Sequence, residues 1–160
     1  FKTEFFTWFK KPKSCSQCGC TKGDNMDLYA TDAPNAHETS FGWASRVEVY
    51  KCALCAGNTR FARMNNPVAL LESRTGRCGE FANCFTLVCR ALGFEARYVY
   101  DTTDHVWVEA WSFEQKRWLH ADSCEAKVDA PRLYEQGWGK KLAFILAVDR
   151  GEVVDVTRRY

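Results

Sequence analysis

The sequence predicts an α+β fold in which one long helix packs on an antiparallel sheet, joined to a four-cysteine zinc-binding subdomain. The chain has 160 residues, 46% hydrophobic and 26% charged, which suits one compact core and excludes disordered, collagen-like and coiled-coil chains. Two Cys-x-x-Cys pairs lie near its beginning, and a helical pattern followed by several strand patterns fills the rest. We expect residues 1–160 to form a single core, with the zinc-binding subdomain at 14–58 and the helix and sheet at 59–160.

The two Cys-x-x-Cys pairs have the spacing of a tetrahedral zinc site, and its predicted ligands are Cys15, Cys18, Cys52 and Cys55. Residues 46–51 alternate like a strand and deliver Cys52 at their end. Four cysteine ligands leave no open coordination position, so the predicted zinc ion, one per chain, is structural. The alternatives are disulfides, four buried thiols without a metal, and Cys20 as a ligand in place of Cys18.

Charge and cysteine usage indicate the compartment and the class of partner. There are 22 basic and 20 acidic residues, a net charge of +2, which argues against binding to nucleic acid. No apolar run reaches the ~20 residues of a membrane span, and no signal peptide is visible at Phe1. Nine cysteines, an odd number, and the lack of an N-x-[ST] sequon argue against a secreted disulfide framework. We expect a cytoplasmic protein, with the nucleus as a second location.

The elements expected before the sheet follow from local signals. Residues 1–13 are too rich in aromatic side chains for a solvated linker and are expected to pack on the fold, whereas residues 31–37 read as a loop. Residues 67–74 suit a short helix with proline in its first turn, and residues 75–77 interrupt the helical pattern. A longer amphipathic helix begins at Cys78, and Gly93 closes it as a left-handed cap.

Five strands are expected in the rest of the chain, and a tight turn at 149–151 joins the last two. Their ranges are 95–100, 104–111, 116–122, 142–148 and 153–157.

Cys78 is the candidate nucleophile. At the start of a helix a thiolate meets unpaired backbone N–H groups and the positive end of the helix dipole, which favour the ionised form. The alternative is an ordinary small apolar residue, as we expect for Cys84 and Cys89 on the core side of the same helix. A glycine break before a helix is a poor core position, so the nucleophile is the preferred interpretation.

The hairpin formed by 104–111 and 116–122 supplies a candidate base and its orienting partner. If residues 112–115 form the loop, His105 lies opposite Asp122, Trp107 opposite His120 and Glu109 opposite Trp118. A carboxylate that holds the histidine ring fixes its tautomer, as in Cys–His–Asp catalysis. His120 is the rival base, but its expected neighbour is not a carboxylate.

The same hairpin face and the segment after it carry aromatic planes beside carboxylates, the usual chemistry of a sugar or peptide cleft. The candidate ligand contacts are Trp107, Glu109, Trp118, Glu125 and Trp138.

Four blocks of the sequence resemble one known family: TGRCGEFANCFTL at 75–87, DHVWVE at 104–109, RWLHADSCE at 117–125 and GWGKK at 137–141. They are similar to cytoplasmic peptide:N-glycanases, whose core is transglutaminase-like (papain-like). The resemblance implies a catalytic triad of Cys78, His105 and Asp122, the zinc site above, and contacts to the chitobiose core of a glycan near Trp107, Trp118, Glu125 and Trp138. Phe81 departs from the family pattern, in which many members carry tryptophan.

The resemblance implies a hydrolase that releases N-linked glycans by cleaving the amide between an asparagine side chain and the first GlcNAc, through a cysteine thioester. The implied substrates are unfolded N-glycosylated proteins or glycopeptides, in ER-associated degradation, and the implied partners are ubiquitin receptors that shuttle to the proteasome. A transglutaminase or cysteine protease would share the triad, and a non-enzymatic scaffold with this fold is the remaining alternative.

Overall fold

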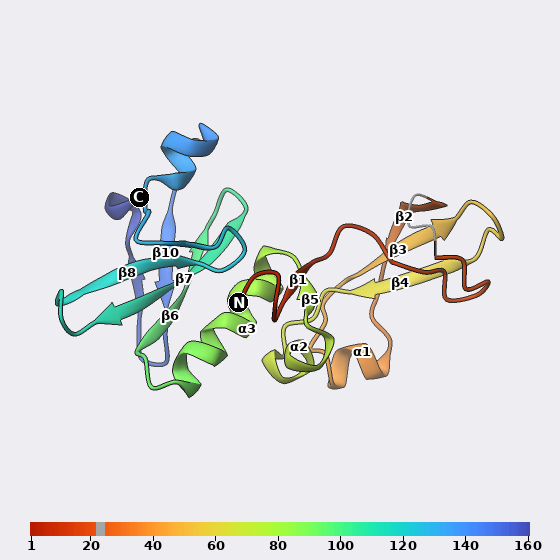
Figure 1. Cartoon of the computed structure of the whole chain (residues 1–160), viewed down its shortest axis with the longest axis horizontal. Coiled ribbons are helices and arrows are strands. Elements are labelled where there is room, and N and C mark those ends of the chain that lie inside the picture. The colour runs from red at the N-terminus through yellow and green to blue at the C-terminus, as the bar shows by residue number, and fades with distance from the viewer. Residues whose placement is uncertain (22–24) are drawn as a thin grey trace. The chain divides into compact units, whose positions relative to one another are not determined.

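The computed structural model describes residues 1–21 and 25–160, and the chain divides into two compact units (Figure 1). Unit 1 comprises Phe1–Thr7 and Gly76–Tyr160, and unit 2 comprises Trp8–Thr75. The chain passes between the units at two short strands, β1 (Thr7–Trp8) and β5 (Thr75–Gly76). In the described part of the chain no helix has the length and apolar character needed to cross a membrane.

Unit 2 is built on a three-stranded antiparallel sheet with strand order β2-β3-β4. The strands are β2 (Met26–Asp32), β3 (Val47–Cys52) and β4 (Asn58–Ala62). Strand β3 ends at Cys52, as the sequence predicts. The unit extends beyond the expected boundary at residue 58 because β4 pairs along its length with β3.

Two short helices complete unit 2. Helix α2 (Pro67–Ser73) has proline at its first turn, as predicted, and the Asn66 side chain caps it. Helix α1 (Ala36–Ser40) lies in the segment expected to be a loop, and β2 also enters that segment. A reciprocal cap explains the helix: the Asn35 side chain accepts from the Glu38 N–H at 2.8 Å, and Glu38 accepts from the Asn35 N–H at 2.7 Å.

The aromatic N-terminal segment packs within each unit, as expected from its composition. In unit 1, Phe6 is fully buried and its ring contacts that of Phe81 edge-on, with centroids 4.6 Å apart. In unit 2, the Phe9 ring stacks on Phe61 at 3.5 Å. Trp8 is the exception, because 45% of its surface is exposed.

Unit 1 contains a six-stranded antiparallel sheet of order β11-β10-β6-β7-β8-β9, which confirms the α+β class (Figure 1). The strands are β6 (Ala96–Asp101), β7 (His105–Ser112), β8 (Arg117–Asp122), β9 (Lys127–Val128), β10 (Ile145–Val148) and β11 (Val153–Asp155). All five predicted strands are present, and β9 is an additional one.

Each face of this sheet is covered by a different element. Helix α3 (Cys78–Ala91) packs on one face, where Ala82 and Cys89 meet Ala96, Val106 and Val108. The opposite face carries Val99 and Trp107, and it is covered by the π-helix η2 (Leu133–Gly137) and the chain end, which includes η3 (Thr157–Arg159). The face that carries Trp107 is therefore an internal face.

Helix α3 starts and stops where the sequence predicts. It begins at Cys78, and Gly93 follows it with φ +86°, the left-handed conformation that glycine adopts at no steric cost. The start depends on Gly76: a Cβ there would lie 2.2 Å from the Cβ of Glu80. Because Glu80 fits against Gly76, its carboxylate reaches back and accepts from the Arg77 N–H at 3.0 Å.

The predicted register of the β7–β8 hairpin is wrong by two residues. Glu109 lies opposite His120 and Trp111 opposite Trp118, because residues 113–116 form the loop and Lys116 takes a left-handed φ of +51°. Moving the four-residue loop by one position shifts every cross-strand pair by two. A two-residue shift keeps each side chain on its face, so His105 and Asp122 still share one and meet diagonally.

Candidate active site

Cys78 occupies the first position of α3, where backbone N–H groups have no acceptor within the helix. The thiol is partly exposed, unlike Cys84 and Cys89 on the same helix, which are buried. The described cysteines of this helix thus divide as predicted, with two in the core and one accessible at the helix start. A nucleophile requires that accessibility.

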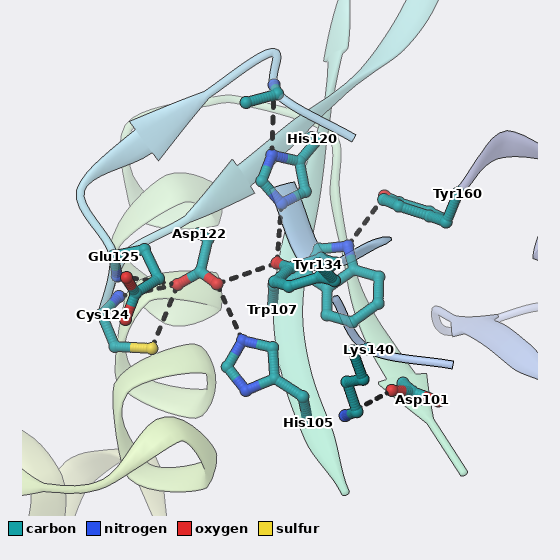
Figure 2. Close-up of polar contacts among 11 residues, drawn as sticks. Asp101, His105, Trp107, His120, Asp122, Cys124, Glu125, Tyr134, Lys140 and Tyr160 are labelled. Atoms are coloured by element: carbon teal, nitrogen blue, oxygen red, sulfur yellow. Dashed lines mark hydrogen bonds and ion pairs between the residues drawn. The ribbon is translucent and has the colours of Figure 1, made fainter. Parts of the chain in front are cut away.

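His105 begins β7 and is 6% exposed. Its Nε2 lies 2.8 Å from Asp122 Oδ2 (Figure 2). This leaves Nδ1 as the ring nitrogen for the hydrogen bond with the Cys78 thiol. Burial alone lowers the pKa of His105, but the hydrogen bonds with Asp122 and Cys78 outweigh it and raise the pKa to about 9. Asp122 therefore stabilises the protonated imidazole that forms when His105 takes a proton.

Asp122 ends β8 and accepts hydrogen bonds at both carboxylate oxygens (Figure 2). Oδ2 accepts from His105 and from the Tyr134 hydroxyl at 2.8 Å. Oδ1 accepts from the N–H groups of Cys124 and Glu125, each at 3.0 Å, and from the Cys124 thiol at 3.1 Å. Burial raises the pKa of Asp122, but the bonds from His105 and Cys124 lower it to about 2, so the carboxylate stays ionised.

His120, the rival base, is fully buried and bonds to a tyrosine. Its Nε2 lies 2.7 Å from the Tyr134 hydroxyl, and its Nδ1 accepts from the Ala130 N–H at 3.4 Å. Burial lowers its pKa to about 4. The prediction that no carboxylate faces His120 across the hairpin is wrong because of the register shift, since Glu109 lies opposite it.

Two of the five candidate ligand contacts lie in the core. Trp107 is fully buried, and its Nε1–H donates to the Tyr160 hydroxyl at 2.7 Å. Glu109 is also fully buried and is bonded to Arg97 at 2.6 Å, to Arg159 at 3.0 Å and to Tyr160 at 2.8 Å. Both are thus committed to the fold, because the chain end covers the hairpin face that the sequence alone leaves open.

The other three candidates are partly or largely exposed. Trp138 is 45% exposed, and its ring lies 4.9 Å from that of His105. Glu125 is partly exposed and follows Asp122 by three residues. Trp118 lies under the Arg97 guanidinium at 4.1 Å and lines two surface cavities of about 950 and 730 Å³, neither of which is lined by a triad residue.

Three further residues shape the site without having been predicted. Tyr134 and Cys124 donate to Asp122. Lys140, two residues after Trp138 in the sequence, forms a 2.7 Å ion pair with the buried Asp101. A turn directly after a strand-ending aspartate is the local signal that predicts donors such as Cys124. Tyr134 has no such signal, because it reaches Asp122 only through the fold. Phe81, at the position that departs from the family pattern, is fully buried against Phe6.

The four predicted zinc-site cysteines meet in unit 2. Their sulfur atoms all lie within 4.8 Å of one another, and the set could hold a metal ion. Two cross-pair distances are 3.6 Å, between Cys15 and Cys55, and 3.9 Å, between Cys18 and Cys52. Cys20 lies beside this set, 3.6 Å from Cys52, and all nine cysteines are free.

The backbone around each Cys-x-x-Cys pair donates to its first sulfur. N–H groups of Cys18 and Gln17 lower the pKa of Cys15 to about 6, and those of Cys55 and Leu54 lower the pKa of Cys52. Gly57 packs closely against this set, because a Cβ there would meet the end of the Gln17 side chain and lie 3.1 Å from the Cys55 sulfur. At Cys15 and Cys52 these turns favour the thiolate, the form that binds a metal. At Cys55 a backbone bond from Gly57 lowers the pKa, but contacts with the neighbouring thiols, chiefly Cys18, outweigh it and raise the pKa to about 12.

Two family models and several curated relatives match this chain. The family model described as Transglutaminase-like superfamily matches residues 29–123, and the Rad4 transglutaminase-like domain matches residues 96–160. A curated relative from Mus musculus, peptide-N(4)-(N-acetyl-beta-glucosaminyl)asparagine amidase, is 56% identical over the whole chain, and the Saccharomyces cerevisiae protein of the same name is 44% identical over it.

The chain spans 24% of the mouse protein and 44% of the yeast protein. A solved structure of Rad4-Rad23 bound to a 6-4 photoproduct UV lesion matches 59% of this chain and 26% of the solved chain. The sequence identity is 21% and the TM-score is 0.49, so this similarity is weak. The family model covers more than half of the chain, including Cys78, His105 and Asp122. This chain belongs to the transglutaminase-like superfamily.

Proposed function

We propose that this chain is the catalytic core of a hydrolase that releases N-linked glycans from unfolded glycoproteins or glycopeptides. It would cleave the amide between an asparagine side chain and the first GlcNAc and convert the asparagine to aspartate. The observation that carries the proposal is the bond of His105 to both Asp122 and Cys78 at the start of α3. Relatives named as the corresponding amidase align with the whole chain at 44% to 56% identity and support the choice of bond.

In the first half of the reaction, His105 takes the proton of Cys78 and the thiolate attacks the side-chain carbonyl of the glycosylated asparagine. The negative charge that develops on the carbonyl oxygen is stabilised by backbone N–H groups at the start of α3, with that of Cys78 as one donor. Such donors are typically worth about 2.7–4 kcal/mol each. The C–N bond then breaks, the imidazolium of His105 protonates the departing glycosylamine, and a thioester joins the peptide to Cys78.

In the second half, His105 deprotonates a water molecule, which attacks the thioester carbonyl. The C–S bond breaks, the proton returns to the Cys78 sulfur, and the new aspartate leaves with one oxygen from water. Asp122 stabilises the imidazolium in both halves and holds the ring with Nδ1 toward the sulfur. It stays ionised throughout, since its donors keep the pKa near 2.

Substrate contacts are proposed at Trp138 and Glu125, which are accessible beside the triad, and more remotely at Trp118. An exposed indole next to the catalytic histidine suits the apolar face of a sugar ring. Trp107 and Glu109 are left out because both are fully buried.

We also propose that the four-cysteine set holds one structural zinc ion. Sulfur atoms placed tetrahedrally at about 2.3 Å from zinc lie about 3.8 Å apart, and the Cys15–Cys55 and Cys18–Cys52 distances of 3.6 and 3.9 Å fit this spacing. The ion would stabilise unit 2 and take no part in the reaction, because the site is closed.

A reducing compartment, the cytoplasm and also the nucleus, is proposed from the free thiols. Proteasome-directed ubiquitin receptors stay a predicted partner on the family resemblance alone. A transglutaminase or protease would use the same triad on other amides, so the bond cleaved has to be measured directly.

The test is deglycosylation of a denatured glycoprotein in heavy-oxygen water. We expect aspartate with one heavy oxygen at each former glycan site and a released glycan that retains both core GlcNAc residues. The Cys78→Ala variant should be folded and inactive, whereas Cys89→Ala, on the buried side of the same helix, should keep its activity. Peptide-bond cuts, glutamine–amine crosslinks or GlcNAc left on asparagine would refute the proposal.

A further inference from the structure

His120 and Tyr134 form a hydrogen-bonded chain that ends on the triad carboxylate (Figure 2). The Tyr134 hydroxyl lies 2.7 Å from His120 Nε2 and 2.8 Å from Asp122 Oδ2. A hydroxyl has one proton to donate. An ionised carboxylate only accepts, so Tyr134 donates to Asp122 and accepts from His120.

That direction assigns the proton of His120 as well. Its Nε2 carries the hydrogen that Tyr134 accepts, and its Nδ1 is unprotonated, facing the Ala130 N–H. A second proton on Nδ1 would oppose that N–H, so both contacts hold only for neutral His120. Burial acts in the same direction and lowers the pKa of His120 to about 4.

We propose that His120 and Tyr134 are positioning residues that orient Asp122 and, through it, His105. Neither residue is exposed, and neither is among the groups expected to touch substrate. Tyr134 and His105 share Oδ2, so the hydroxyl fixes the side of the carboxylate on which the imidazole binds. With Nε2 of His105 held there, Nδ1 stays directed at Cys78. This positioning role concerns the geometry of the triad. It rests on the proposed function only where glycan release is used to assay turnover.

The titratable groups that face Asp122 come from every element around it. They are His105 on β7, His120 on β8, Tyr134 in η2, and Cys124 and Glu125 in the turn after β8, while Cys78 on α3 bonds to His105. Burial and the nearby Asp122 charge raise the pKa of both Tyr134 and Cys124, so these two remain neutral donors. Asp122 is thus ionised while His120, Tyr134 and Cys124 are neutral, and the carboxylate acts on His105, whose pKa is raised to about 9.

The first experiment compares wild type, Tyr134→Phe, His120→Phe and the double variant in glycan release. Tyr134→Phe keeps the buried ring and should lower kcat roughly 10- to 100-fold with little change in KM, as is usual when a partner that orients a reacting group is lost. His120→Phe should cost less, and His120→Gln, which restores an N–H donor, should recover most of the loss. If His120 acts through Tyr134, adding His120→Phe to the Tyr134→Phe variant should cost nothing further.

The second experiment needs no glycan and follows alkylation of Cys78 against pH by peptide mass spectrometry. A poorly oriented Asp122 stabilises the imidazolium less, so in Tyr134→Phe the midpoint for thiolate formation should move to higher pH. Unfolding scans give the folded fraction, by which all rates are corrected. Additive losses in the double variant, or an unchanged midpoint, would overturn the positioning role. If the wild-type protein releases no glycan but the alkylation midpoint still shifts in Tyr134→Phe, the proposed function is refuted and the positioning role stands.

Discussion

Replacing Asp122 by asparagine tests the triad most directly, because every group around its carboxylate donates. The two oxygens accept five hydrogen bonds, and an asparagine side chain has one oxygen and an NH₂ that only donates. The backbone N–H groups of Cys124 and Glu125 are fixed in the turn, so the amide oxygen should face them. The NH₂ then faces His105 and Tyr134.

In that arrangement His105 accepts at Nε2 and carries its proton on Nδ1, the nitrogen that should deprotonate Cys78. The carboxylate charge is lost as well, and with it the main support of the imidazolium. Raising the pKa of His105 from 6.5 to about 9 corresponds to about 3 kcal/mol of imidazolium stabilisation. Asp122 and Cys78 both contribute to this rise, so roughly 300-fold is the upper limit for the loss of the Asp122 charge. The wrong tautomer adds to it and brings the expected loss of turnover to about 10³- to 10⁴-fold.

The assay is single-turnover release of glycan from a denatured glycoprotein by Asp122→Asn, with near-ultraviolet circular dichroism to establish the fold. His120→Ala, on the same strand, is the comparison and should be much milder. A folded Asp122→Asn variant within tenfold of wild-type turnover would refute the assigned role. So would a His120→Ala variant that is the more severe of the two.

Three further outcomes are expected. Purified protein should contain one zinc ion per chain, and a chelator should lower its thermal stability by removing about 10 kcal/mol of binding free energy; metal-free folded protein would contradict this. Glu109→Gln should destabilise the fold by about 3–5 kcal/mol in urea titrations, because buried Arg97 loses its charge partner; a raised KM at unchanged stability would instead place Glu109 at the substrate. The raised pKa of His105 contributes stability to the fold that is complete below pH 6.5 and is lost as the pH rises through about 9. The lowered pKa of Asp122 contributes stability that is complete above pH 3.8 and is lost as the pH falls toward about 2. Urea midpoints should therefore be highest between these limits, and a midpoint that rises from pH 7 to 9 would refute the assignment.

Local signals in the sequence determine the elements that carry the triad. The glycine break and Gly93 set the two ends of α3, because a tight approach and a left-handed φ are properties of single residues. Alternation places His105 and Asp122 on one face of their strands, since successive side chains in a strand point to opposite sides. The Cys-x-x-Cys spacing likewise sets the two sulfur atoms within each pair, although the two pairs, with Cys18 lying 34 residues before Cys52, meet only in the fold. Each of these features depends on neighbours a few residues away.

The tertiary structure decides what depends on distant parts of the chain. The hairpin register follows from which four residues form the loop, and turn propensity does not separate residues 112–115 from 113–116 strongly enough to assign it. Trp107 and Glu109 have the chemistry of ligand contacts, but Tyr160, about 50 residues away, covers them and uses their polar atoms. Tyr134 reaches Asp122 only because η2 packs on the same sheet face. Burial of a side chain is set by the element that covers it, and a linear pattern of residues does not encode which element that is.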